Sequence, residues 1–245
     1  MRIRAGSKKY ARQTIDSDEV TVRIDRPTHR IVSQYWSIEE YVYSVVPPQD
    51  VVAVSESAYL QTISNVYEQV ERFHPVVAMD PERVLGVDPE LMLVSSFGRA
   101  DYTSLARSSG VPVYRMQTQF QTLAQVEESI RLTGYLTGND EAAEREAARF
   151  HAAIEQAQGL RPSNAAKPRI LGLGGRYSYG KDTLFQDIVT TLGGINVGAE
   201  NDLKGYDSVD FEQIIRWNPE WIIAGAEPGQ SHSFTYGPSE AFEIA

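Results

Sequence analysis

The chain has 245 residues, which is long enough for two lobes of roughly 100 residues each. Hydrophobic residues make up 42% and charged residues 23%, so a sizeable core can be buried and a wholly disordered chain is excluded. The net charge of 23 − 33 = −10 disfavours non-specific nucleic-acid binding, and the lack of cysteine excludes disulfides, thiol nucleophiles and Cys-based metal sites.

A short hairpin is predicted over residues 10–25, because apolar and polar residues alternate from Val20 to Asp25. From His29 onward, short apolar runs alternate with helical patterns, which is typical of a mostly parallel sheet covered by helices. The pattern Ser37-x-x-Glu40 predicts a capping box at the first helix. The predicted strands are 31–32, 51–54, 91–94 and 111–114, and the predicted helices are 37–46, 58–73, 101–109 and 122–137.

A long helix is predicted next, because apolar residues from Ala143 to Ala157 are spaced 4, 3, 4 and 3 apart. A second series follows a Pro-containing linker, with strands at 170–173, 195–197 and 221–224 and helices at 183–192 and 210–217. We therefore predict an N-terminal extension and hairpin (1–28), an N-terminal α/β lobe (29–138), a connecting helix (139–159) and a C-terminal α/β lobe (160–245). The second lobe is shorter than the first after its helix-strand repeat, so we expect it to be incomplete and to continue past Ala245.

An internal repeat supports two related lobes. Residues 81–94 align without gaps on residues 211–224, an offset of 211 − 81 = 130. Each segment has a Glu in the first turn of a helix, a stop at Asp-Pro or Asn-Pro, and an apolar strand. Arg30-Ile-Val and Arg169-Ile-Leu repeat the entry to each lobe. The alternative is that helix–turn–strand units look alike in any α/β protein.

These segments, together with Gly110-Val-Pro-Val-Tyr114 and Gly180-Lys-Asp-Thr183, resemble the class III periplasmic binding proteins. These are the substrate-binding subunits of ABC importers for ferric siderophores, cobalamin and haem, and the resemblance covers roughly residues 18–245. It implies two α/β lobes joined by one long helix, with the ligand in the cleft between them. It also implies a monomeric periplasmic protein, or an extracellular membrane-anchored one, whose partner is an ABC permease and not nucleic acid. The family's signal peptide and lipidated Cys are absent from this sequence, which we interpret as a trimmed chain.

The family also carries one surface Glu in each lobe that docks onto arginines of the permease. Glu82 and Glu212 occupy these positions of the motif. An exposed carboxylate that meets a cationic socket sets register and encounter rate more than affinity. The alternative is a Glu that only stabilises a helix N-terminus.

Aromatic and basic residues follow the predicted strands, where ligands of parallel α/β lobes gather. Flat rings stack on planar chelates, and cationic side chains pair with anionic oxygen atoms. The arginines of this set favour an anionic ferric siderophore over neutral cobalamin, and haem stays open as a ligand because a Tyr can bind its iron. No resident cofactor is expected. The predicted ligand-binding residues are Tyr35, Trp36, Tyr59, Phe97, Arg99, Arg115, Arg176, Tyr177, Tyr179, Lys181, Tyr206 and Tyr236.

Two other functions stay open. The segment Gly175-x-x-x-x-Gly180-Lys181 nearly matches a phosphate-binding loop, which would indicate a nucleotide-binding enzyme, although Asp182 stands where Ser or Thr should bind magnesium. The same fold can also bind a bare transition metal, but the four histidines are scattered. We find no catalytic constellation and predict a protein that is not an enzyme.

Overall fold

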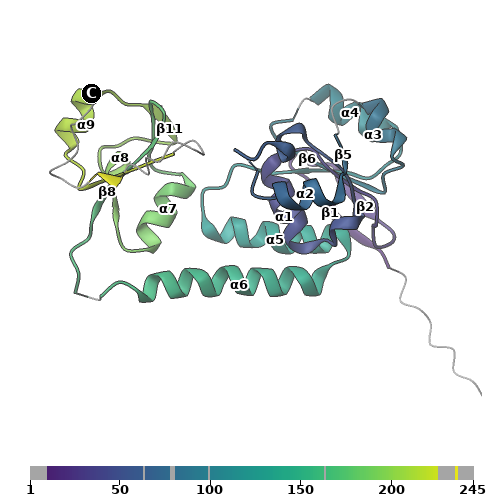
Figure 1. The fold of residues 1–245 in the computed structure, drawn as a ribbon, viewed down its shortest axis with the longest axis horizontal. Helices are drawn as coiled ribbons and strands as arrows, with labels where there is room; N and C mark the ends of the chain where they lie inside the picture. The colour runs from purple at the N-terminus through teal and green to yellow at the C-terminus, as the bar shows by residue number, and fades with distance from the viewer. Residues whose placement is uncertain are drawn as a thin grey trace, which may run out of the picture. The chain divides into compact units, whose positions relative to one another are not determined.

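The computed structural model describes residues 10–62, 64–77, 81–98, 100–162, 164–225 and 235–236. The chain divides into two compact units (Figure 1). Unit 1 comprises residues 1–118 and 128–148, and unit 2 comprises residues 119–127 and 149–245.

Unit 1 opens with the predicted hairpin. Strand β1 (Arg12–Ile15) pairs antiparallel with β2 (Thr21–Ile24), with Ile15 opposite Thr21. Val22 and Ile24 are buried, while the residues between them face solvent. The alternation in the sequence therefore predicted both the strand and its buried face.

A five-stranded sheet forms the centre of unit 1, in the order β5-β4-β3-β6-β7, and all of its strand pairs are parallel. Buried residues line both faces, which explains why the strands read as continuous apolar runs. The strands are β3 (Ile31–Ser33), β4 (Val51–Val54), β5 (Val76–Val77), β6 (Leu91–Ser95) and β7 (Val113–Met116). The helices are α1 (Trp36–Val45), η1 (Pro48–Asp50), η2 (Glu56–Tyr59), α2 (Tyr67–Phe73), α3 (Pro81–Gly86), α4 (Ala100–Ser108) and α5 (Leu123–Thr137).

Two helix starts differ in outcome. The capping box predicted at Ser37 is wrong: α1 begins one residue earlier and its N-cap, Tyr35, has no side-chain cap. Glu40 instead accepts a hydrogen bond from Asn65 Nδ2 (2.8 Å). At α5, which begins within the predicted helix 122–137, a capping box is present, because Thr122 and Gln125 exchange hydrogen bonds of 3.2 and 3.3 Å between side chain and backbone. The helix predicted over 58–73 is also interrupted, since η2 and α2 are separate elements.

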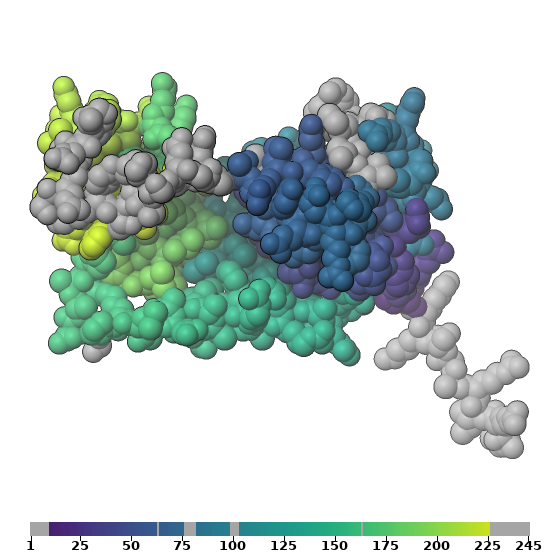
Figure 2. Space-filling model, viewed as in Figure 1, coloured from purple at the N-terminus to yellow at the C-terminus, as the bar shows by residue number. Residues whose placement is uncertain are grey.

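The long helix is confirmed as α6 (Asp140–Gly159), 20 residues in one run. The division between the units falls inside it, between Ala148 and Arg149. Its buried residues are Ala143 and Ala147, both in unit 1. Figure 2 shows the side of α6 turned to the viewer uncovered along the helix.

Unit 2 contains a mixed sheet in the order β11-β9-β8-β12-β13, with β10 also beside β8. The β8 pairs with β10 and β12 are parallel, whereas the other pairs are antiparallel. Strands β9 and β11 occupy segments that the sequence predicted as loops. The strands are β8 (Arg169–Gly174), β9 (Tyr177–Tyr179), β10 (Ile195–Asn196), β11 (Tyr206–Ser208), β12 (Trp221–Ala224) and β13 (Thr235–Tyr236). The helices are α7 (Leu184–Thr191), α8 (Val197–Glu200) and α9 (Phe211–Trp217).

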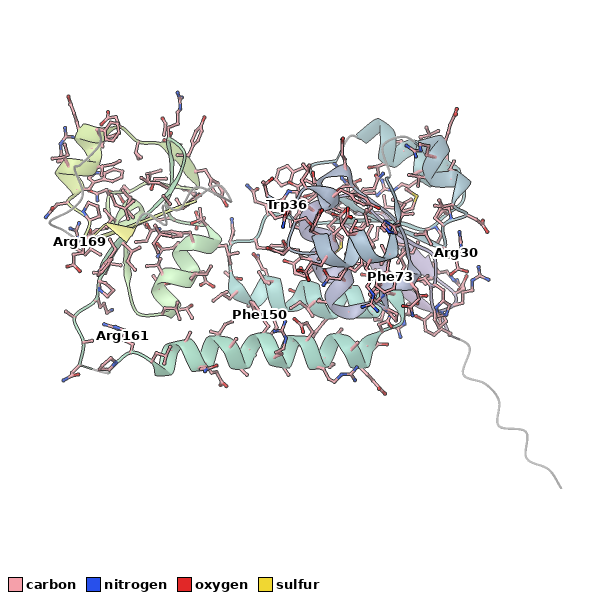
Figure 3. All side chains as sticks on the ribbon, in the orientation of Figure 1. Arg30, Trp36, Phe73, Phe150, Arg161 and Arg169 are labelled. Carbon is pink, nitrogen blue, oxygen red and sulfur yellow. The ribbon has the colours of Figure 1, made fainter. Side chains whose placement is uncertain are left out.

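The internal repeat extends to individual hydrogen bonds. Asp88 and Asn218, which align in the repeat, both have a left-handed φ, 49° and 48°. Arg30 Nε donates to the carbonyls of Val87 and Asp88, at 3.0 and 2.9 Å. Arg169 donates from Nη1 to the Asn218 carbonyl (2.6 Å) and from Nη2 to the carbonyl before it (2.8 Å). Both arginines are labelled in Figure 3. In each unit an arginine at the start of a sheet strand, Arg30 directly before β3 or Arg169 as the first residue of β8, therefore caps the end of the repeated helix with a guanidinium.

Candidate ligand-binding site

Two exposed aromatic residues of unit 1, Trp36 and Phe97, follow strands at a switch in sheet topology. From β3 the chain moves to β4 and β5 on one side, and then crosses to β6 on the other side of β3. In such sheets, ligands bind beyond the carboxyl ends of the strands at this switch point. Trp36 follows β3 and is 39% exposed (Figure 3), and Phe97 follows β6 and is 60% exposed. Large apolar rings left open at this position suit a ligand surface.

Tyr35 and Tyr59 sit deeper than Trp36. Both pack against the core of unit 1, and the rings of Tyr35 and Trp36 lie 5.7 Å apart. The Tyr59 hydroxyl donates to the Pro75 carbonyl (2.6 Å), and burial raises the pKa of this hydroxyl. Tyr35 therefore supports Trp36 from the core side, whereas Tyr59 is bonded to the segment before β5.

The sequence predicted Arg115 in a loop after a strand, but Arg115 lies inside β7. Its guanidinium is mostly buried and donates four hydrogen bonds to the protein. Three go to carbonyls of the turn after β6, at Ser95 (3.2 Å), Ser96 (2.6 Å) and Gly98 (3.0 Å), and one goes to Asp18 (2.8 Å). An arginine used in this way positions the turn that carries Phe97.

A buried carboxyl that the sequence analysis did not single out lies beside these elements. Glu39 of α1 is fully buried and accepts hydrogen bonds from the Ser55 backbone N–H (2.6 Å) and the Ser55 hydroxyl (3.1 Å). Burial raises the pKa of Glu39 to about 7, although the bonds from Ser55 act in the opposite direction. The available signal was a Glu next to Ile38 on the apolar side of a helix, the side that also carries Val42.

In unit 2, two exposed tyrosines lie at the edge formed by β9 and β11. Tyr177, 47% exposed, pairs with Gly174 at the carboxyl end of β8, and Tyr206, 51% exposed, pairs with Tyr179. The Arg176 guanidinium lies 5.6 Å from the centre of the Tyr177 ring, within the range of a cation–π contact. This edge offers two flat rings and one cation to solvent.

Tyr179 packs against its neighbours in unit 2. Its ring lies 5.2 Å from Phe185 and 5.5 Å, edge to face, from Tyr206. It also covers β8: a Cβ on Gly172 would stand 2.5 Å from the Tyr179 ring. Burial, and to a lesser degree Tyr206, raises the Tyr179 pKa. Tyr179 thus supports Tyr206 and needs glycine at position 172.

The near match to a phosphate-binding loop folds differently. Residues 177–179 form strand β9, so the segment does not wrap around a helix N-terminus. Lys181 Nζ forms an ion pair with Asp202 (2.7 Å). The Thr183 hydroxyl caps α7 by accepting from the Gln186 N–H (3.2 Å). This geometry does not provide the backbone cradle that phosphate needs.

Two predicted ligand residues cannot be placed. Arg99 lies outside the described residues, and Tyr236 of β13 is described only by its backbone, which pairs with Ile222 of β12.

The two glutamates of the repeat are exposed in the first turns of α3 and α9. Glu212 lies between Asp210 and Gln213, which form a complete capping box, so the first turn of α9 does not need Glu212 as its cap.

Within the described parts of the chain, no three His, Asp or Glu side chains come together as metal ligands would. Among the described helices, none combines the length and apolarity needed to span a membrane.

A family model described as periplasmic binding protein matches residues 31–235. The chain belongs to this family. The resemblance noted from the sequence is thereby confirmed, and the hairpin β1–β2 lies outside the matched residues.

Named relatives and solved structures agree with this family. The cobalamin-binding protein of Halobacterium salinarum is 26% identical over 214 residues, 86% of this chain and 57% of the relative. The vitamin B12-binding protein of Salmonella typhi is 24% identical over 169 residues, 66% of this chain and 61% of the relative. The chain thus spans about three fifths of the length of these relatives. The periplasmic haem-binding protein RhuT from Roseiflexus superposes with a TM-score of 0.67 at 22% identity, covering 80% of this chain and 76% of that structure, which shows the fold.

Proposed function

We propose that this protein is the extracytoplasmic substrate-binding component of an ABC importer, and that its cargo is a metal chelate. It binds the cargo without transforming it and delivers it to the permease. The exposed aromatic rings at the strand ends are the observation that carries this proposal. Trp36 and Phe97 stand at the switch point of one sheet, and Tyr177 and Tyr206 stand at the edge of the other.

Cobalamin is the first candidate for the cargo. Three arginines in the sequence favour an anionic ferric siderophore. One of them, Arg115, however donates its hydrogen bonds to three carbonyls and to Asp18. Lys181 is likewise paired with Asp202. The described aromatic surface therefore has less cationic character than the sequence suggested, which suits a neutral, flat corrinoid. The two relatives named above for cobalamin or vitamin B12 support the same choice.

A ferric siderophore is the second candidate, and one observation favours it. Arg176 lies at the exposed edge of unit 2 beside Tyr177, where a guanidinium and a ring together can receive an anionic oxygen on an aromatic chelator. Competition between cyanocobalamin and a ferric hydroxamate for the same site separates the two candidates.

The intrinsic fluorescence of Trp36 tests whether the switch point receives the cargo. We expect cyanocobalamin, which absorbs in the region of tryptophan emission, to quench the protein in a saturable way. The Trp36→Phe variant should need a several-fold higher cyanocobalamin concentration for half-saturation of the quenching, because phenylalanine offers the cargo a smaller ring. Trp217→Phe is the matched control and should reach half-saturation at the same concentration as the wild type. Equal half-saturation of the wild type and of Trp36→Phe would remove Trp36 from the site.

Docking to the permease is proposed for Glu82 and Glu212. Each is exposed in the first turn of a helix whose far end is capped by an arginine, Arg30 before β3 or Arg169 of β8. The two units therefore present their glutamates in equivalent local settings. Glu82→Lys and Glu212→Lys should each abolish uptake in transport-competent cells and leave chelate binding unchanged. Loss of binding in either variant would contradict the docking role.

A further inference from the structure

The turn between β1 and β2 is hydrogen-bonded to other elements of unit 1. Asp16, which is buried, accepts hydrogen bonds from the backbone N–H groups of Asp18 and Val20, both at 3.0 Å, and so closes the turn. The other oxygen of Asp16 accepts from Arg107 Nη2 of α4 and from the backbone N–H of Arg115 (3.2 Å). The turn is therefore attached to α4 and β7 through one carboxylate.

Asp18 completes this attachment from the surface. Its two oxygens accept from Arg115 Nη1 (2.8 Å) and Arg107 Nη1 (3.0 Å). The same Arg115 guanidinium donates to the carbonyls of Ser95, Ser96 and Gly98. Arg115 thus donates one hydrogen bond to the hairpin. It donates three others to carbonyls at the end of β6 and in the following turn, which carries Phe97. A guanidinium is rigid and planar, so fixing one of its nitrogens restricts the others.

The opposite end of the hairpin is fixed independently. Arg12 donates to the Tyr135 carbonyl (2.5 Å) and to the Asp140 carboxylate, and its guanidinium lies 4.9 Å from the centre of the Tyr135 ring. Gln13 and Tyr135 also exchange hydrogen bonds of 3.2 and 3.3 Å between backbone and phenol. These contacts join β1 to the end of α5 and the first residue of α6. A hairpin held at both ends is a stiff support for Arg115.

We propose that the hairpin is a brace that sets the conformation of the 96–98 turn, with Arg115 as the positioning residue between Asp18 and that turn. The consequence for binding rests on the proposed function: the brace keeps Phe97 in place for the cargo. The family match does not include the hairpin, because the matched residues begin at residue 31.

Native-state hydrogen exchange on the full chain, without ligand, tests the brace. Asp18→Asn keeps the shape of the side chain but turns an amide N–H₂ toward one of the two guanidinium groups. We expect the amides of Phe97 and Gly98 to exchange roughly tenfold faster, the effect of losing one hydrogen bond to a charged group. Asp25→Asn is the matched control: it removes the same charge from the same hairpin, where Asp25 pairs only with Arg23 (2.8 Å) among the described ion pairs. It should leave these amides within twofold of the wild type.

Arg115→Lys provides a second variant that keeps the charge facing Asp18. A lysine ammonium cannot reach three carbonyls and a carboxylate together, so the same two amides should again exchange faster. If both Asp18→Asn and Arg115→Lys exchange like the wild type, the brace is wrong. Cyanocobalamin affinity is then measured on the same variants, and a several-fold weaker affinity is expected for both. Faster exchange with unchanged affinity would keep the brace but overturn the part of the proposed function that puts Phe97 against the cargo.

Discussion

The buried carboxyl of Glu39 should make the stability of the protein depend on pH in a specific direction. Burial raises its pKa from the ordinary value of 4.5 to about 7. A carboxyl whose pKa is higher in the folded protein than in the unfolded chain disfavours folding once it ionises. The folded protein therefore loses stability as pH rises from about 4.5, and the loss levels off above pH 7.

The magnitude follows from the two pKa values. The interval from 4.5 to about 7 corresponds to about 3 kcal/mol at about 1.4 kcal/mol per pH unit. Glu39→Gln removes the titration and keeps an oxygen to accept the hydrogen bond from the Ser55 N–H. Between pH 5 and pH 9 the wild type should lose about 2 to 3 kcal/mol relative to Glu39→Gln. Glu40 and Tyr43, the other titratable groups that interact with Glu39, are the same in both proteins.

Urea unfolding at a series of pH values measures this difference directly. Glu68→Gln is a suitable control, because Glu68 is an exposed residue of α2 and its replacement removes the same charge. Glu68→Gln should still lose about 2 to 3 kcal/mol of stability between pH 5 and pH 9, because Glu39 is unchanged in it. Parallel pH profiles for the wild type and Glu39→Gln would refute the reasoning, because they would mean that the carboxyl titrates alike in the folded and unfolded chain.

Three further predictions concern stability. Arg169→Ala should lower the free energy of unfolding by about 1 to 2 kcal/mol in urea titrations, because the last carbonyls of α9 lose their donor; no loss would contradict the capping role. Gly172→Ala should cost about 1 to 3 kcal/mol, since its Cβ would meet the Tyr179 ring, whereas Gly86→Ala, with open space around it, should not destabilise. Burial acts to raise the pKa of Asp18, but the hydrogen bonds from Arg115 and Arg107 outweigh it and lower the pKa. The stability difference between the wild type and Asp18→Asn should therefore be present at pH 7 and shrink as pH falls through the lowered pKa; a difference that does not change with pH would contradict this assignment.

Elements with a clear period or a fully apolar run were predictable from the sequence. The hairpin, the strands of the unit 1 sheet except the two-residue β5, and α6 all follow from patterns of this kind. Strands β9 and β11 were not predictable, because three residues are too few to show a period. The sequence also does not show that β9 folds back on β8 after two residues, or that β11 pairs with β9, from which it is distant in the chain. The capping box at Ser37 failed for a similar reason. Glu40 is engaged by Asn65, a contact that no local pattern reveals.

The candidate site was predictable in composition but less so in the roles of individual residues. Strand ends placed Trp36 and Phe97 correctly at the carboxyl edge of the sheet. The sequence could not tell an exposed cation from one occupied by backbone carbonyls, which is why Arg115 was expected to face the ligand and instead supports the turn beside it. Glu39 was overlooked because a glutamate on a buried helix face is recognisable only once its partner, Ser55, is brought next to it by the sheet.

Equilibrium dialysis of the full chain against cyanocobalamin, a ferric hydroxamate and haemin tests the central claim most directly. The account predicts saturable binding of one chelate per chain with a Kd of about 1 µM or tighter, with cyanocobalamin bound most strongly. Tightest binding of the ferric hydroxamate would exchange the first and second candidates. Failure of all three to bind with a Kd below about 1 mM would contradict the claim that this protein captures a metal chelate.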